Sequence, residues 1–231
     1  MIITPALSSK KEQFDAIYLN LHQNIRAHSA HVGVVCGIMA QQCSARLFDE
    51  YGISADNLII PIMQGGDYHD IGKCSIPYHL FQKNFSPNQT ETETIRQHPG
   101  YTTELLHKYS CVLFDCERAK RIALDMGHYH HEKYDGSGYP KKLKGDKIPF
   151  AAQLCALADF LDNRAGDRRC DSFDFAAETI IKNKGIWFSP EAVACFEMSQ
   201  EEIKKLYTTK NNWIKAGLKT LQKEPPQEQK E

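Results

Sequence analysis

Two histidine motifs, about sixty residues apart, hold the side chains of this sequence that are best suited to chemistry. Residues 69–73 read HDIGK, and residues 130–140 read HHEKYDGSGYP. The first motif places an imidazole beside a carboxylate, with a lysine three residues further on. The second places two imidazoles before a glycine-rich turn. Imidazole and carboxylate groups together suit iron, manganese, zinc or nickel, so metal-assisted hydrolysis is the first hypothesis.

Three further residues of the ligand type stand at the ends of expected helices or inside one. His28 lies near the start of a helix, His98 begins another just before Pro99, and Asp159 lies within the apolar helix expected from Ala151 to Leu161. A carboxylate among alanines and leucines is costly unless it is paired or metal-bound. Each feature alone has an ordinary explanation, such as a surface histidine or an aspartate that caps a neighbouring helix. Their coincidence in one small helical chain favours a metal centre.

The residue types also indicate what the metals would do. The cluster contains no cysteine, which argues against a structural zinc site. Two metals that share one carboxylate would lie roughly 3.5–4 Å apart and clamp an in-line displacement at phosphorus, with a bridging hydroxide as the nucleophile. Lys73 follows Asp70 by three residues. Its ammonium is therefore expected to reach a phosphate oxygen or the bridging water.

Composition excludes several classes of protein. The 231 residues carry a net charge of -1, which gives no general case for binding a nucleic acid polymer or an acidic membrane. The N-terminus lacks the apolar segment of a signal peptide, and no run approaches the roughly 18 apolar residues of a membrane span. The eight cysteines show no CxxC pair and are expected to be reduced thiols. We therefore expect a cytoplasmic protein.

Helical spacing of apolar residues dominates the chain, and no alternating strand of useful length occurs. Capping-box pairs predict helix starts at Ser9 with Glu12, at Thr90 with Glu93, and at Ser199 with Glu202. The other expected helices are listed by range: 32–52, 55–68, 99–109, 115–130, 151–161, 173–182 and one that begins at 189–190. The prediction is an all-α single domain over residues 1–222, followed by a disordered tail over 223–231.

The two motifs, taken with the glycine-rich run, resemble the signature of the HD-GYP domain, a branch of the HD metal-dependent phosphohydrolase superfamily. The resemblance runs from about His28 to Phe196. It implies an all-helical HD-type domain with an HD-GYP C-terminal extension and a centre of two or three metals, often iron or manganese. It also implies a phosphodiesterase that opens cyclic di-GMP, a bacterial second messenger, to linear pGpG.

The resemblance assigns roles by position. One metal would be held by His28, His69, Asp70 and Asp159, and the other by Asp70, His98, His130 and His131. Asp70 would thus bridge two divalent ions, for which zinc and nickel remain alternatives. Lys73 would contact the scissile phosphate, and Arg168 would grip a substrate phosphate. Gly138 and Tyr139, with Pro140, would shape the substrate site, and this loop is linked to signalling partner proteins in the family.

Three positions depart from the family pattern. Asn24 stands where three-metal members carry a glutamate, so we expect two metals and a reaction that stops at pGpG. His31 replaces an arginine, and Asp171 replaces a basic residue that contacts phosphate. These departures keep two alternatives open, namely hydrolysis of another cyclic dinucleotide such as cyclic GMP-AMP, and a signalling module that binds a cyclic dinucleotide but is catalytically weak. We expect no fused receiver or sensor domain, and a homodimer is left open.

Overall fold

The structure, a computed structural model, describes residues 9–82, 85–165 and 172–208. Those residues form α-helices and short 3-10 helices (η). The α-helices are α1 (Lys10–Asn20), α2 (Gln23–Gln42), α3 (Ser44–Tyr51), α4 (Ala55–Tyr68), α5 (Gln89–Ile95), α6 (His98–Leu113), α7 (Glu117–Tyr129), α8 (Phe150–Ala165), α9 (Phe173–Lys182) and α10 (Pro190–Thr208). The 3-10 helices are η1 (Ile71–Ser75), η2 (Tyr78–Phe81) and η3 (Gly145–Lys147).

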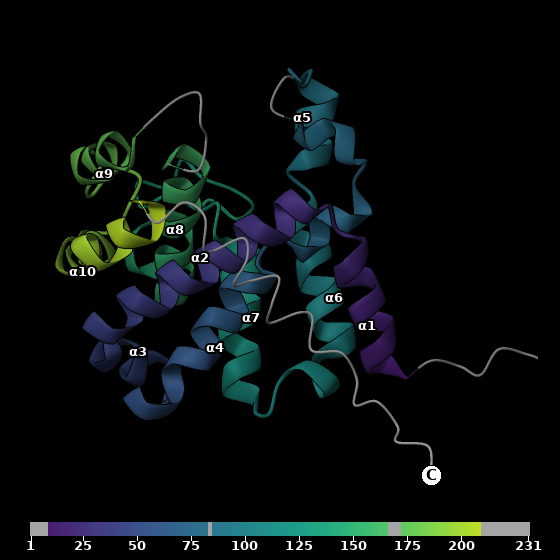
Figure 1. Ribbon diagram of the computed structural model, residues 1–231, viewed down its shortest axis with the longest axis horizontal. Helices are drawn as coiled ribbons and strands as arrows, with labels where there is room; N and C mark the ends of the chain where they lie inside the picture. The colour runs from purple at the N-terminus through teal and green to yellow at the C-terminus, as the bar shows by residue number, and fades with distance from the viewer. Residues whose placement is uncertain (1–8, 83–84, 166–171, 209–231) are drawn as a thin grey trace, which may run out of the picture.

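The larger hydrophobic core lies around α2, which packs against α4, α8 and α10. The middle of α2 is buried because its apolar residues recur on more than one face, from Val32 to Ala40. Helix α8 is apolar along nearly its whole length and is buried from Phe150 to Cys155. Helices α9 and α10 cover α8 on one side of the molecule (Figure 1). Side chains of α8 therefore lie inside the protein.

A smaller hydrophobic core joins α1 to α6 on the opposite side of the molecule (Figure 1). Phe14 lies at its centre, with edge-to-face contacts to the rings of Tyr68 and Tyr109. Ile71, directly after the His-Asp pair, is buried in the same core. The small core thus holds the turn that follows α4 against α6.

Most of the predicted helices are present, and two have the predicted bounds. Helices α4 and α9 span residues 55–68 and 173–182, as expected. The capping box at Ser9 with Glu12 is confirmed. Helix α7 begins two residues later than expected, because Cys116 caps it. The ends of helices are thus well determined by local sequence where one capping residue has no competitor.

The helix expected over 32–52 is divided at Cys43 into α2 and α3, and α2 begins at Gln23. Two of the three helix starts predicted from capping-box pairs are also wrong. The capping box before α5 uses Asn88 with Glu91 instead of Thr90 with Glu93, since asparagine two residues earlier is at least as good a cap. Ser199 does not begin a helix, because α10 runs unbroken from Pro190 to Thr208 and buries Ser199 in its interior. The tail expected over residues 223–231 lies outside the described residues.

The described ranges contain no β-strand, only one isolated bridge between Lys184 and Phe188. The all-α prediction is therefore confirmed for this part of the chain. The described cysteines form no disulfide, and Cys170 lies outside the described residues. None of the described helices has the length and apolarity needed to cross a bilayer.

Candidate metal centre

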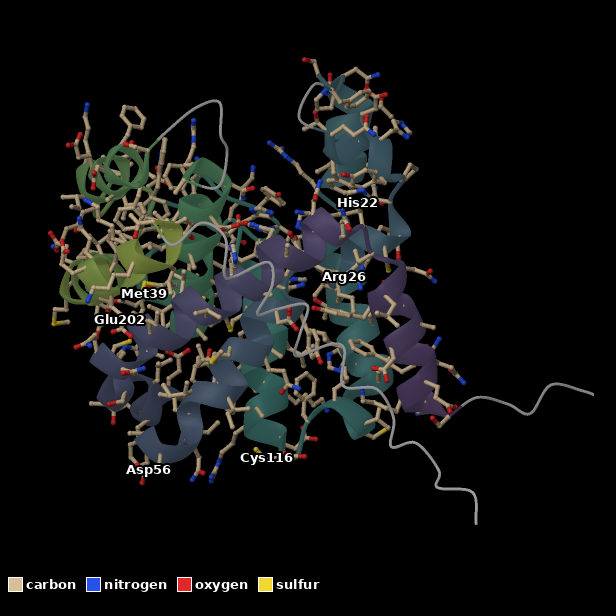
Figure 2. All side chains as sticks on the ribbon, in the orientation of Figure 1. His22, Arg26, Met39, Asp56, Cys116 and Glu202 are labelled. Carbon is tan, nitrogen blue, oxygen red and sulfur yellow. The ribbon has the colours of Figure 1, made fainter. Side chains whose placement is uncertain are left out.

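The ligand-type residues come from five helices whose ends or inner faces meet. Asp56 in the first turn of α4 and Cys116 at the start of α7 lie at the same lower edge of the molecule (Figure 2). Both helices run inward from that edge, and their last residues lead directly into His69 and His130. Helix α6 begins at His98. The helix ends therefore deliver three imidazoles to one region.

Hydrogen bonds between the Thr102 side chain and the backbone hold the turn after α4 against α6. The buried hydroxyl of Thr102 donates to the carbonyl oxygen of His69 at 3.1 Å and accepts from the N–H of Gly72 at 2.9 Å. A Cβ atom on Gly72 would lie 2.2 Å from the carbonyl oxygen of His98, so only glycine permits this approach. The sequence pattern did not single out Thr102, because a threonine inside an amphipathic helix carries no signal of its own.

The first cluster consists of His28, His69, Asp70 and Asp159, whose ligand atoms all lie within 4.8 Å of one another. The Nε2 atom of His28 lies 2.9 Å from Oδ1 of Asp159, and Nε2 of His69 lies 3.7 Å from the same oxygen. His69 and Asp70 are fully buried, with side chains 0% and 1% exposed. Two carboxylates and two imidazoles thus converge on one point inside the protein.

The second cluster consists of His98, His130 and His131, whose ligand atoms also lie within 4.8 Å of one another. The Nε2 atom of His98 lies 3.3 Å from Nε2 of His130 and 3.1 Å from Nε2 of His131. Three ring nitrogens therefore face one another in a largely buried space.

Asp70 lies between the clusters, and its two oxygens face different ones. Oδ2 lies 3.3 Å from Nε2 of His69 and 3.8 Å from Nε2 of His28, both in the first cluster. Oδ1 lies 3.3 Å from Nε2 of His98 and 3.7 Å from Nε2 of His130, both in the second. This is the arrangement that a bridging carboxylate requires. The structure brings together all seven residues that the sequence predicted as ligands.

The hydrogen bonds of the histidines show that cations fit these clusters. Nδ1 of His69 donates to the Gly66 carbonyl at 2.7 Å, and Nδ1 of His98 donates to the Ile95 carbonyl at 2.7 Å. Nδ1 of His130 lies 3.0 Å from the Met126 carbonyl. A carbonyl can only accept, so each neutral ring keeps a lone pair on the Nε2 that faces the centre.

The unpaired atoms of the clusters support the same conclusion. Nε2 of His69 and Oδ1 of Asp70 are buried and lack a hydrogen bond, although charged or polar groups lie within 4 Å of each. Buried polar atoms without partners are rare. A divalent ion in each cluster would satisfy both atoms and would separate the lone pairs of His98 and His130.

The electrostatics differ between the two clusters. In the first, burial alone would lower the pKa of His28, but hydrogen bonds to Asp159 and Asp162 raise it to about 9. Burial likewise opposes the charge on His69, but the charge of Asp70 raises the pKa of His69 to about 10. In the second, burial lowers the pKa of His98 to about 3 and that of His131 to about 4. The second cluster therefore presents neutral imidazoles, as metal binding requires.

The predicted substrate contacts that the structure describes lie beside the clusters. Lys73 is hydrogen-bonded to Oδ2 of Asp70, and its ammonium lies 5.4 Å from the centre of the Phe81 ring. The ring of Tyr139 stacks on the ring of His131, with 4.7 Å between their centroids. The Arg96 guanidinium lies 5.2 Å from the centroid of the Tyr139 ring. Arg168 and Asp171 lie outside the described residues.

Gly138 is buried against the backbone of the His-His motif. A Cβ atom there would lie 2.4 Å from the backbone nitrogen of Lys133 and 2.5 Å from the carbonyl oxygen of His131. Glu132, also buried, accepts from the N–H of Lys141 at 2.6 Å and from that of Leu143 at 3.1 Å. Gly138 and Glu132 therefore hold the loop that carries Tyr139 against the second cluster. Glu132 belongs to the second histidine motif, but its position in the sequence predicts no role for it.

Comparisons with known proteins give the family and a range of relatives. A family model described as the HD domain matches residues 65–192. A 3'3'-cGAMP-specific phosphodiesterase 2 from Vibrio cholerae is 29% identical over 186 residues, which cover 79% of this chain and 34% of that protein. A probable cyclic di-GMP phosphodiesterase from the same species is 31% identical over 168 residues, covering 71% of this chain and 38% of that protein.

A cyclic di-GMP phosphodiesterase from Thermotoga maritima is 29% identical over 167 residues, covering 71% of this chain and 44% of that protein. The chain thus spans less than half the length of these three curated relatives. The solved structure of an HDG"Y"P protein from Bdellovibrio bacteriovorus matches with a TM-score of 0.57 at 16% identity, over 80% of this chain and 52% of that one. That likeness concerns the fold.

Proposed function

This chain belongs to the HD domain family, in its HD-GYP branch, and from that premise we propose that it is a metal-dependent phosphodiesterase that opens cyclic di-GMP to linear pGpG. The observation that carries the proposal is the position of Asp70, whose two oxygens face two separate clusters of ligand atoms. A dinuclear centre bridged by one carboxylate suits the displacement of an oxygen at phosphorus.

Each part of the proposed site has a separate task. The first cluster would hold one divalent ion, and the three imidazoles of the second would hold another, with iron or manganese as the expected metals. When bound, the two ions would supply Lewis acidity and activate water for attack on the phosphodiester. The buried position of His69, Asp70 and His98 limits access of other water to this point.

Lys73 has the position expected of a phosphate-binding residue. Its ammonium bonds to Asp70 and remains partly accessible, at 18% exposure of the side chain. An ammonium has three donors, so it can keep Asp70 and still donate to a phosphate oxygen. It would thereby stabilise the negative charge that develops in the transition state. Tyr139 stacks on His131, so its phenol lies beside the second cluster, where it could contact a bound dinucleotide.

A second candidate substrate is 3'3'-cGAMP. It is favoured by the relative from Vibrio cholerae that is named as specific for that dinucleotide. Both substrates present the same phosphodiester to the metals, so the centre alone does not separate them. Discrimination would depend on contacts with the bases.

One experiment tests the activity and the choice between substrates. The protein is loaded with manganese or reduced iron and incubated overnight with cyclic di-GMP and 3'3'-cGAMP separately, and the products are resolved by chromatography. We expect linear pGpG from cyclic di-GMP and no product with Asp70→Ala. Cleavage of 3'3'-cGAMP alone would mean that the substrate is 3'3'-cGAMP and not cyclic di-GMP. Tight binding of either dinucleotide without cleavage would instead support a signalling module.

A further inference from the structure

Asp162 is a buried carboxylate that collects donors from two other helices. It lies on α8, three residues after Asp159, and its side chain is 7% exposed. Its Oδ2 accepts from Nδ1 of His28 at 2.7 Å, and its Oδ1 accepts from the hydroxyl of Tyr207 at 3.1 Å. Nδ1 of His31 lies 3.2 Å from the same Oδ1. Among the described residues, Asp162 itself belongs to neither cluster of ligand atoms.

The contact with Asp162 determines which nitrogen of His28 faces the first cluster. An ionised carboxylate only accepts, so Nδ1 of His28 carries a proton. Nε2 is then left beside Asp159 and Asp70, at 2.9 Å and 3.8 Å. Ligand histidines commonly donate their other N–H to a carboxylate or carbonyl, which fixes the ring and strengthens the ligand. His28 is held by a side chain, whereas His69, His98 and His130 are held by backbone carbonyls.

Tyr207 connects this contact to the last described helix. It lies near the end of α10, which packs against both α2 and α8 (Figure 1). Burial and the charge of Asp162 hold the pKa of its phenol well above the usual value, so the hydroxyl keeps its proton and donates. Its ring lies 5.5 Å from the ring of Phe173 and 6.4 Å from that of His31. Both its ring and its hydroxyl are thus held in place.

We propose that Asp162 is a positioning residue for the first metal cluster, and that Tyr207 and His31 hold its carboxylate in the orientation that aligns His28. The inference rests on the proposed function, since it requires a metal in the first cluster. Sequence offered one usable sign of it, a second aspartate one turn after Asp159 in an apolar helix. No feature of the sequence relates Tyr207, 45 residues away, to Asp162.

The chain contains a matched control pair. The hydroxyl of Tyr51 donates to Oδ2 of Asp125 at 3.0 Å, and Tyr51 and Asp125 lie on α3 and α7. Neither belongs to a metal cluster. Both pairs join a tyrosine hydroxyl to a largely buried carboxylate. Substitutions in the Tyr51–Asp125 pair therefore alter an equivalent tyrosine–carboxylate contact that has no connection to His28.

The test is calorimetric titration of the metal-stripped full chain with Mn²⁺, with thermal unfolding measured in parallel. Asp162→Asn is expected to weaken one of two classes of Mn²⁺ site by about 10- to 100-fold. Tyr207→Phe is expected to weaken the same class by about 2- to 10-fold, the equivalent of one hydrogen bond. Asp125→Asn and Tyr51→Phe should leave both classes unchanged. Tyr207→Phe should add little in the Asp162→Asn background, because the two act through one contact.

The possible results separate this inference from the proposed function. If wild type binds two Mn²⁺ ions and Asp162→Asn binds them equally well, the positioning role is wrong and the dinuclear centre stands. If the control variants lose as much Mn²⁺ affinity as their counterparts, the effect is general destabilisation and the inference is again wrong. Absence of Mn²⁺ binding by wild type would overturn both. Tyr207→Phe removes a single oxygen, so it keeps the test decisive if Asp162→Asn does not fold.

Discussion

At the scale of single residues, the centre depends on what each polar atom faces. Asp70 is surrounded by four imidazole nitrogens and one ammonium. Burial alone would raise its pKa, but the charges of His69 and Lys73 hold the pKa well below the usual value. The carboxylate is therefore ionised throughout the range in which the protein would work. If Asp70 bridges two metals, as proposed, this ligand is ionised without a change of pH.

Lys73 is expected to contribute to catalysis and not to metal binding. Lys73→Met should retain both metals, because the ammonium is not a ligand, and should lower kcat by about 10²- to 10³-fold through loss of transition-state stabilisation. Elemental analysis and steady-state kinetics on the same preparation measure the two quantities. Lys120→Met is the control, since Lys120 pairs with Glu117 on the surface of α7. Loss of metal from Lys73→Met would show that its role has been misassigned.

Asp125 leads to a prediction about pH and stability. Burial raises its pKa from 3.8 to about 6, although the hydrogen bond from Tyr51 opposes the shift. The folded state therefore keeps a proton that the unfolded state releases, and this contribution to stability is lost as the pH rises from about 4 through about 6. Asp125→Asn removes the titration and keeps an acceptor for Tyr51. Its free energy of unfolding relative to wild type should rise by about 1–2 kcal/mol between pH 4.5 and 7.5.

Urea unfolding of both proteins at the two pH values measures that difference directly. Because each comparison is made at one pH, protonation of the buried histidines affects both proteins alike. A difference between variant and wild type that stays constant with pH would mean that Asp125 has an ordinary pKa.

At the scale of elements, the centre is built by the ends of helices and by the segments that follow them. Helix α4 leads into His69, α7 leads into His130, and α6 starts at His98. The loop after α7 then folds back, with Gly138 against the backbone of residues 131–133. Its return is secured by Glu132, which accepts from two backbone N–H groups further along the loop. The loop thus depends on one buried side chain for its position beside His131.

Glu132→Gln is expected to loosen this loop without removing metal. The amide of glutamine has one acceptor oxygen, so either Lys141 or Leu143 loses its backbone partner, at a cost of about 1–2 kcal/mol. KM should rise several-fold as Tyr139 loses its fixed place, and hydrogen exchange should increase over residues 133–149. Glu50→Gln is the matched control, because Glu50 accepts from the N–H of Phe150 at 3.1 Å. It should lose stability and keep its KM. Equal KM values in the two variants would contradict a role for the loop in substrate binding.

At the scale of the whole molecule, the sequence predicted what local pattern determines. Apolar spacing predicted the bounds of α4 and α9, and the His and Asp residue types marked the clusters before any contact was known. Contacts between distant segments could not be predicted from the sequence. Nothing in the spacing of Tyr207 relates it to Asp162, and nothing around Thr102 shows that it joins the His69 carbonyl to Gly72. The helix start predicted at Ser199 is wrong because packing overrides a capping pattern that lies inside a buried helix.

The same long-range geometry leads us to expect that the stability of the fold depends on metal. Both clusters draw ligands from different helices, so an ion bound there links α2, α8 and the ends of α4, α6 and α7. An ion that binds only the folded state at a hundred times its Kd adds about 2.7 kcal/mol to the free energy of unfolding. For a chain of this size that corresponds to a fall in Tm of about 5–10 °C on chelation.

Calorimetric scans before and after chelation, with residual metal measured, give the shift in Tm, and added Mn²⁺ should reverse it. Asp70→Ala should unfold at a Tm that chelation leaves unchanged, because both clusters have lost the ligand they share. A wild-type Tm that is unaffected by complete removal of metal would mean that the helices hold the clusters in place unaided.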